Sequence, residues 1–95
     1  MDTMKTTLKV WENSNHKSKF ELAEESGLWR VYLDRSTLQT RTLDKYLHIE
    51  TLPKTPRWRT VLSTIDFVLE RSHSHPEGRR ELAQMKEQLQ QLIHQ

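Results

Sequence analysis

The sequence TPRWRTVLSTIDFVLERS (residues 55–72) decides the fold. Its apolar residues recur every three or four positions, so at about 100° per residue they fall on one stripe of a helix. Thr55 stands where an N-cap belongs, and Pro56 suits the first helical position because its missing N–H would have no partner there. We therefore predict a core helix over residues 55–72 that buries a stripe of six side chains: Trp58, Val61, Leu62, Ile65, Val68 and Leu69.

Phe67 breaks this pattern, because on the same helical wheel it points almost directly away from the stripe. Two interpretations stay open. Another element of the same chain covers the ring, or the ring contacts a partner protein, since aromatic side chains are favoured interface anchors.

The first half of the chain shows period-two alternation, which is typical of strands with one buried face. We predict a loose end over residues 1–7, a short strand over residues 8–11, and a hairpin over residues 17–34 that turns at Gly27. The face of the second hairpin strand that carries Trp29, Val31 and Leu33 would point inward. Residues 37–42 would add a third strand.

The second half reads as helical. Residues 43–50 predict a short helix with Thr42 as its cap, and residues 52–56 form a stiff linker with two prolines. The last helix, Pro76–Ile93, has a narrow apolar stripe. The predicted fold is one α+β domain over residues 1–95. A small antiparallel sheet of two to three strands from the N-terminal part (8–42) packs on two to three helices from the C-terminal part (43–95).

The charge of the chain is small but uneven. The formal net charge is +2, of which residues 1–60 contribute +3 and residues 61–95 contribute −1. This is a mild bias toward acidic partners. The chain has no cysteine, which excludes disulfides and thiol chemistry. No apolar run approaches the ~20 residues that a membrane span needs, so we expect a cytoplasmic protein without membrane contact.

The sequence has no recognisable catalytic set. Its only glycines are Gly27 and Gly78, so it has no glycine-rich phosphate loop, and no serine lies in a nucleophile motif. Asp66, Glu70 and His73 follow one another at i, i+4 and i+7, a pattern that could ligate a divalent metal. Such a trio is more often a solvated polar face. We predict a protein that is not an enzyme, with no cofactor, no metal site and no small-molecule substrate.

Two surfaces combine cations in ways that suit an anionic ligand. On the outer face of the predicted sheet, Lys19, Arg30, Tyr32 and Arg41 would project together, and aromatic rings among cations can stack bases while the cations hold phosphates. The other interpretation is an ordinary solvated face, because mixed charge is normal on exposed strands. The second surface is the start of the core helix, where backbone N–H groups and the helix dipole favour anions. Its cations are Lys54, Arg57 and Arg59.

These observations support two hypotheses about function. The leading one is a non-catalytic regulatory or adaptor domain that acts through protein–protein contacts, self-associates as a dimer, and uses apolar anchors at Phe67, Leu82, Met85, Leu89 and Leu92. The alternative is a nucleic-acid-binding or transcription-associated protein that uses a basic and aromatic face made of Arg30, Tyr32, Arg41, Lys54, Arg57 and Arg59.

Overall fold

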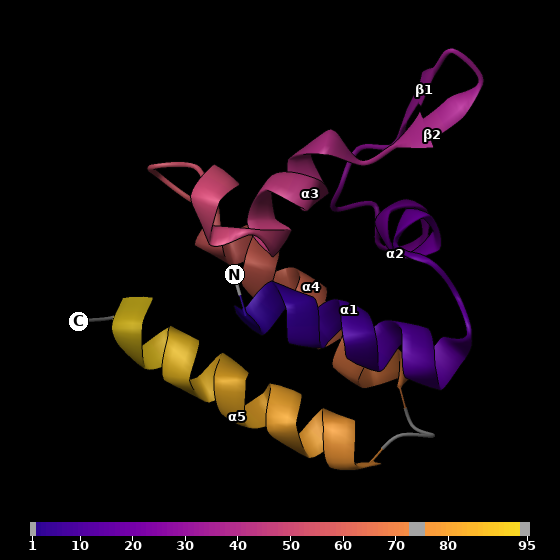
Figure 1. Ribbon diagram of the computed structural model, residues 1–95. Helices are drawn as coiled ribbons and strands as arrows, with labels where there is room; N and C mark the ends of the chain where they lie inside the picture. Colours follow the sequence, from indigo (N-terminus) through magenta and orange to yellow (C-terminus); the bar gives the residue numbers. More distant parts are fainter. Residues whose placement is uncertain (1, 73–75, 94–95) are drawn as a thin grey trace.

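A short β-hairpin separates two N-terminal helices from the helices of the second half (Figure 1). The computed structural model describes residues 2–72 and 76–93. The α+β class is confirmed, with a small antiparallel sheet in the N-terminal half and helices in the C-terminal half. The elements in chain order are α1 (Asp2–Asn15), α2 (Lys19–Ser26), β1 (Tyr32–Asp34), β2 (Thr37–Gln39), α3 (Arg41–Leu47), the 3₁₀ helix η1 (Ile49–Thr51), α4 (Trp58–Arg71) and α5 (Pro76–Ile93).

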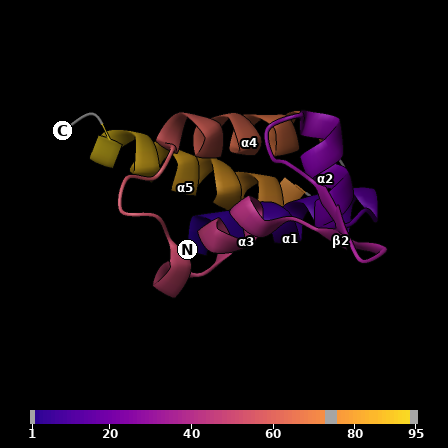
Figure 2. The same ribbon diagram turned by 90° about the horizontal axis from the view of Figure 1, so that it is seen from above.

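The core lies where α1, α4 and α5 pack on one another, and α3 packs on α1 (Figure 2). The predicted stripe of α4 faces this core: Val61, Ile65 and Val68 are fully buried, and the other apolar members pack partly buried around them. Burying one such side chain contributes about 1.5–3 kcal/mol. The predicted role of α4 as the hub of the core therefore matches the packing.

The strand predicted over residues 8–11 is wrong, because these residues continue helix α1. The buried residues of α1 include Met4, Thr7, Val10 and Trp11, whose spacing of three and four is helical. The hydroxyl of Thr7 donates to the carbonyl oxygen of Thr3 at 2.7 Å, which lets a polar residue lie in the core. The helical spacing was overlooked because Thr7, one of the buried residues, is polar, so the alternation of residues 8–11 was the more visible pattern.

The first strand of the predicted hairpin is also wrong, because Lys19–Ser26 is helix α2. Ser18 and Glu21 have the spacing of a capping box, and the N–H of Ser18 donates to Oε1 of Glu21 at 3.5 Å. Gly27 ends the helix in the left-handed region, at φ 69°, and its N–H donates to the carbonyl oxygen of Ala23. The glycine that suggested a hairpin turn is therefore a helix C-cap.

The true hairpin comes later and is shorter. β1 pairs antiparallel with β2, with Leu33 opposite Leu38, and the two turn residues Arg35 and Ser36 both have positive φ. Two positive φ angles in a two-residue loop define a type I′ turn. Trp29 is buried whereas Leu33 is 74% exposed, so the predicted inward face of residues 28–34 does not exist as one surface.

Two helices of the second half, α3 and α4, begin at different residues from those predicted. α4 begins at Trp58 with Arg57 as its N-cap, and the backbone N–H of Arg57 donates to the hydroxyl of Tyr46 at 2.7 Å. Thr40, not Thr42, is the N-cap of α3. The last helix, α5, has the predicted bounds.

The apolar residues proposed as partner anchors lie at different depths. Leu82 and Leu89 are buried in the core of this chain, Met85 is half-buried, and Leu92 is 67% exposed. Phe67 is half-buried, with its ring centroid 5.8 Å from that of Trp11 on α1. Another element of the chain thus covers part of Phe67, as one of the two interpretations held. Leu82 and Leu89 therefore serve the core of this chain, and the role of the five residues as partner anchors stays a prediction.

Candidate functional site

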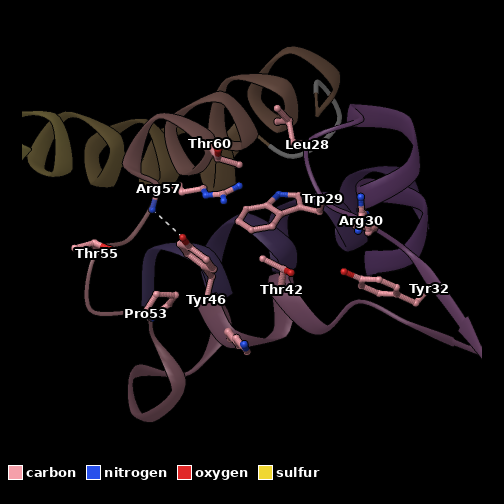
Figure 3. Close-up of a pocket in the computed structure, with 11 residues that line it drawn as sticks. Leu28, Trp29, Arg30, Tyr32, Thr42, Tyr46, Pro53, Thr55, Arg57 and Thr60 are labelled. Carbon is pink, nitrogen blue, oxygen red and sulfur yellow. Dashed lines mark hydrogen bonds between the residues drawn. The ribbon is translucent and has the colours of Figure 1, made fainter.

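A groove of about 640 Å³ opens between α3, the start of α4 and residues 28–32 (Figure 3). Figure 3 shows eleven side chains that line it. Residues of three sequence segments meet here: Trp29 and its neighbours before the hairpin, Thr42 and Tyr46 from α3, and Arg57 and Thr60 from the start of α4. A concave surface that combines aromatic rings with a few polar groups is the default place for a binding site.

Trp29 forms the wall of the groove and is held on two sides. Its indole N–H donates to Oγ1 of Thr64 on α4 at 2.9 Å, and its ring meets that of Tyr46 edge-on at a centroid distance of 5.0 Å. Buried indole N–H groups generally find such a partner. Tyr46 in turn accepts the backbone N–H of Arg57. These bonds join α3, α4 and the segment before the hairpin into one rigid surface.

The groove is cationic. Arg30, Lys45 and Arg57 line it, and none of the described lining residues is acidic. All three cations are exposed at its rim. Arg30 also lies against the ring of Tyr32, with its guanidinium carbon 5.7 Å from the ring centroid. In Figure 3 the guanidinium of Arg57 is directed toward the indole of Trp29. Cations and aromatic rings therefore share one concave surface.

The outer face of α3 extends this cationic surface. Arg41 and Lys45 are exposed and stand four residues apart, which puts them on the same side of the helix. Asp44, the acid of this helix, has partners within the chain: its Oδ1 accepts from Nζ of Lys19 at 2.9 Å and from Oγ1 of Thr40 at 3.0 Å. The carboxylate thus ties α3 to α2 and is engaged by a cation of its own chain.

The structure brings together only part of the predicted anion-binding set. Arg30, Tyr32 and Arg57 line the groove, and Arg41 begins the adjoining helix. Lys54 and Arg59 are exposed but do not line it. Arg30 and Tyr32 of the first predicted surface and Arg57 of the second therefore meet in one groove.

Sequence reasoning missed Lys45, Trp29 and Tyr46. The signal for Lys45 was its i, i+4 relation to Arg41, which was hidden because the helix was predicted over residues 43–50 and Arg41 was placed in a strand. Trp29 and Tyr46 gave no such signal, because their meeting depends on tertiary contacts of Trp29 with Thr64 on α4 and with Tyr46 on α3. The metal candidate includes His73, which lies outside the described residues. Among residues 2–72 and 76–93, no cluster of three or more metal-ligating side chains occurs.

The described helices include none that is long and apolar enough to span a bilayer. The fold and the groove define a small α+β domain that presents a cationic, aromatic-lined surface beside a short exposed helix. Such a surface can bind phosphates through its cations and pack flat rings against Tyr32.

Comparison with solved structures then finds a close relative. The DNA-binding domain of the sensor histidine kinase ChiS from Vibrio cholerae superposes with a TM-score of 0.93 and shares 55% sequence identity. The match covers 99% of this chain and 88% of that domain. The chain therefore belongs to the same family as this domain. No protein-family model matches the sequence, and no curated protein matches it significantly. The relative supports the nucleic-acid hypothesis rather than the protein–protein hypothesis.

Proposed function

We propose that the chain is a non-catalytic DNA-binding module whose contact surface is the cationic groove together with the outer face of α3. The observation that carries this proposal is the composition of the groove. Three cations and no acid line it among the described residues, although the chain as a whole carries a net charge of only +2. Because the chain is related to a DNA-binding domain, we interpret this local positive charge as a surface for DNA phosphates.

The arrangement suits duplex DNA because it separates two kinds of contact. Arg30, Arg57 and Lys45 at the rim would hold phosphates, which fixes the orientation of the protein but reads no sequence. Arg41 and Thr42 at the exposed start of α3 are the side chains placed to reach base edges, since a helix fits the major groove. The hydrogen bonds of Trp29 to Thr64 and of Arg57 to Tyr46 would hold the phosphate-binding side chains in a fixed position relative to the start of α3.

Fluorescence anisotropy of a labelled duplex of about two helical turns tests this function. With the three cations Arg30, Lys45 and Arg57 on phosphates, the plot of log K against log salt should have a slope of roughly −3. Arg57→Ala should reduce this slope by about 1 and weaken binding to all duplexes alike. Arg80→Ala on α5 is the matched control, because Arg80 is also exposed but lies outside the groove.

The proposal fails if the wild-type chain at about 100 µM leaves the anisotropy unchanged at about 50 mM salt, where even non-specific binding should appear. It also fails if Arg80→Ala lowers the slope as much as Arg57→Ala does, because the contact would then not be centred on the groove.

A further inference from the structure

The β1–β2 hairpin exposes two leucines directly opposite each other. Leu33 and Leu38 are cross-strand partners and are 74% and 47% exposed. The hairpin extends away from the helical core in Figure 1, and α5 lies on the other side of α1. Cross-strand partners point to the same face of a ribbon, so the two side chains form one apolar edge. Neither leucine belongs to the hydrophobic core or packs against it, so this apolar edge has no role in the core packing of the described residues.

The turn of the hairpin carries a second unusual feature. Arg35 has φ 51° and Ser36 has φ 66°, in positions where type I′ turns normally use Asn and Gly. A residue with a Cβ pays about 1–2 kcal/mol for this conformation. The backbone of Arg35 at the tip of the hairpin thus has an unfavourable conformation. Residues with such unfavourable φ angles cluster at functional sites.

The base of the hairpin adjoins the cationic groove, because Tyr32 both begins β1 and lines the groove. Arg30 precedes the hairpin and Arg41 follows it, so cations flank its base as well as its tip. The hairpin itself adds one acidic residue, Asp34, to the one cation at its tip. The hairpin therefore extends from the edge of the surface proposed to hold DNA, with the Leu33–Leu38 pair on the opposite face of the ribbon from Tyr32.

We propose that the hairpin enters the minor groove of duplex DNA, with Arg35 in the groove and the Leu33–Leu38 edge wedged against a base step. This inference rests on the proposed function. Proteins that bind the minor groove combine an inserted arginine with an apolar wedge that partly unstacks a step and bends the duplex. A two-stranded ribbon closed by a two-residue turn is a slim element for this purpose. The bound duplex would be bent and richer in A·T pairs.

The test compares three duplexes that differ only at the central steps: A·T pairs, G·C pairs, and inosine·cytosine pairs. The last keep the minor-groove edge of A·T pairs but lack the thymine methyl group in the major groove. We expect the wild-type chain to bind the A·T and inosine·cytosine duplexes about tenfold more tightly than the G·C duplex. Energy transfer between dyes on the duplex ends should rise on binding, because the duplex bends.

The variant L33S/L38S should lose both the tenfold preference and the bend, while it keeps salt-dependent binding through the groove. Leu92→Ser is the matched control, since Leu92 is 67% exposed at the far end of the chain and should change neither reading. Leu33→Ser alone, at the more exposed position, repeats the test should the double variant not fold.

The outcomes separate this inference from the proposed function. Equal affinity of the wild type for all three duplexes, or a bend that survives in L33S/L38S, overturns the hairpin proposal and leaves DNA binding intact. A preference for A·T over inosine·cytosine also overturns it, because the leucines would then be reading thymine methyl groups in the major groove. A chain that binds none of the duplexes overturns the proposed function as well.

Discussion

Replacing Thr64 with valine should break the bond that fixes the wall of the groove. Thr64 is fully buried, and its hydroxyl accepts the indole N–H of Trp29 at 2.9 Å while donating to the carbonyl oxygen of Thr60 at 2.7 Å. Valine has nearly the same shape, so little packing is lost. The indole N–H, however, stays buried without a partner, which costs about 1–3 kcal/mol. For a domain of this size, 2 kcal/mol corresponds to a decrease in Tm of roughly 8–16 °C.

Urea denaturation of a double-mutant cycle isolates this bond. In the background Trp29→Phe no indole N–H exists, so Thr64→Val should cost about 1–2 kcal/mol less there than in the wild type. Thr7→Val is the matched control, because Thr7 is equally buried and its hydroxyl makes the same kind of bond within its helix, to Thr3. It should cost less than about 1 kcal/mol.

Additive effects in the cycle would refute the reasoning. If Thr64→Val costs the same with tryptophan or phenylalanine at position 29, the indole N–H is not satisfied by Thr64, and the rigid wall of the groove does not form as described. A cost for Thr64→Val equal to that of Thr7→Val would lead to the same conclusion.

Three further changes test the fold by their effect on the free energy of unfolding. Gly27→Ala should destabilise the chain by about 1–2 kcal/mol, because its φ of 69° is unfavourable for a Cβ although no atom lies within 4 Å of one; an unchanged stability would contradict the C-cap. Ser36→Gly should stabilise it by up to about 1 kcal/mol, since glycine tolerates positive φ in the hairpin turn; a loss of stability would contradict the type I′ assignment. Leu82→Ala should cost about 2–5 kcal/mol, whereas Leu92→Ala should cost almost nothing, and similar costs at the two positions would contradict the packing of α5.

The sequence predicted the helices of the second half well because their apolar stripes are long. α4 and α5 each span several turns, so the period of 3.6 residues is unambiguous. The first half gave shorter windows. There, alternation over residues 8–11 and 19–22 resembled strands. The stronger signals indicated helices but came from polar residues: Thr7 lies within a helical stripe, and Ser18 and Glu21 have the spacing of a capping box.

The candidate site was only partly predictable for a physical reason. Arg30, Tyr32 and Arg57 were identified by charge and ring type, which the sequence displays directly. Their meeting in one groove depends on Tyr46 bonding Arg57 and on Trp29 bonding Thr64, contacts that span 11 and 35 residues. No local pattern encodes such pairs. The exposed edge of Leu33 and Leu38 was hidden for the same reason, because alternation alone does not say which face is covered.

The most direct test of the DNA-binding surface is an NMR titration of the ¹⁵N-labelled chain with duplex DNA. The proposed function predicts that shifts of backbone amide signals concentrate at Arg30, at Arg41 and Lys45 on α3, and at Arg57, together with the indole N–H of Trp29. The signals of Arg80 and Glu87, exposed on α5, should stay in place. Shifts concentrated along α5, with the groove residues unmoved, would contradict the account.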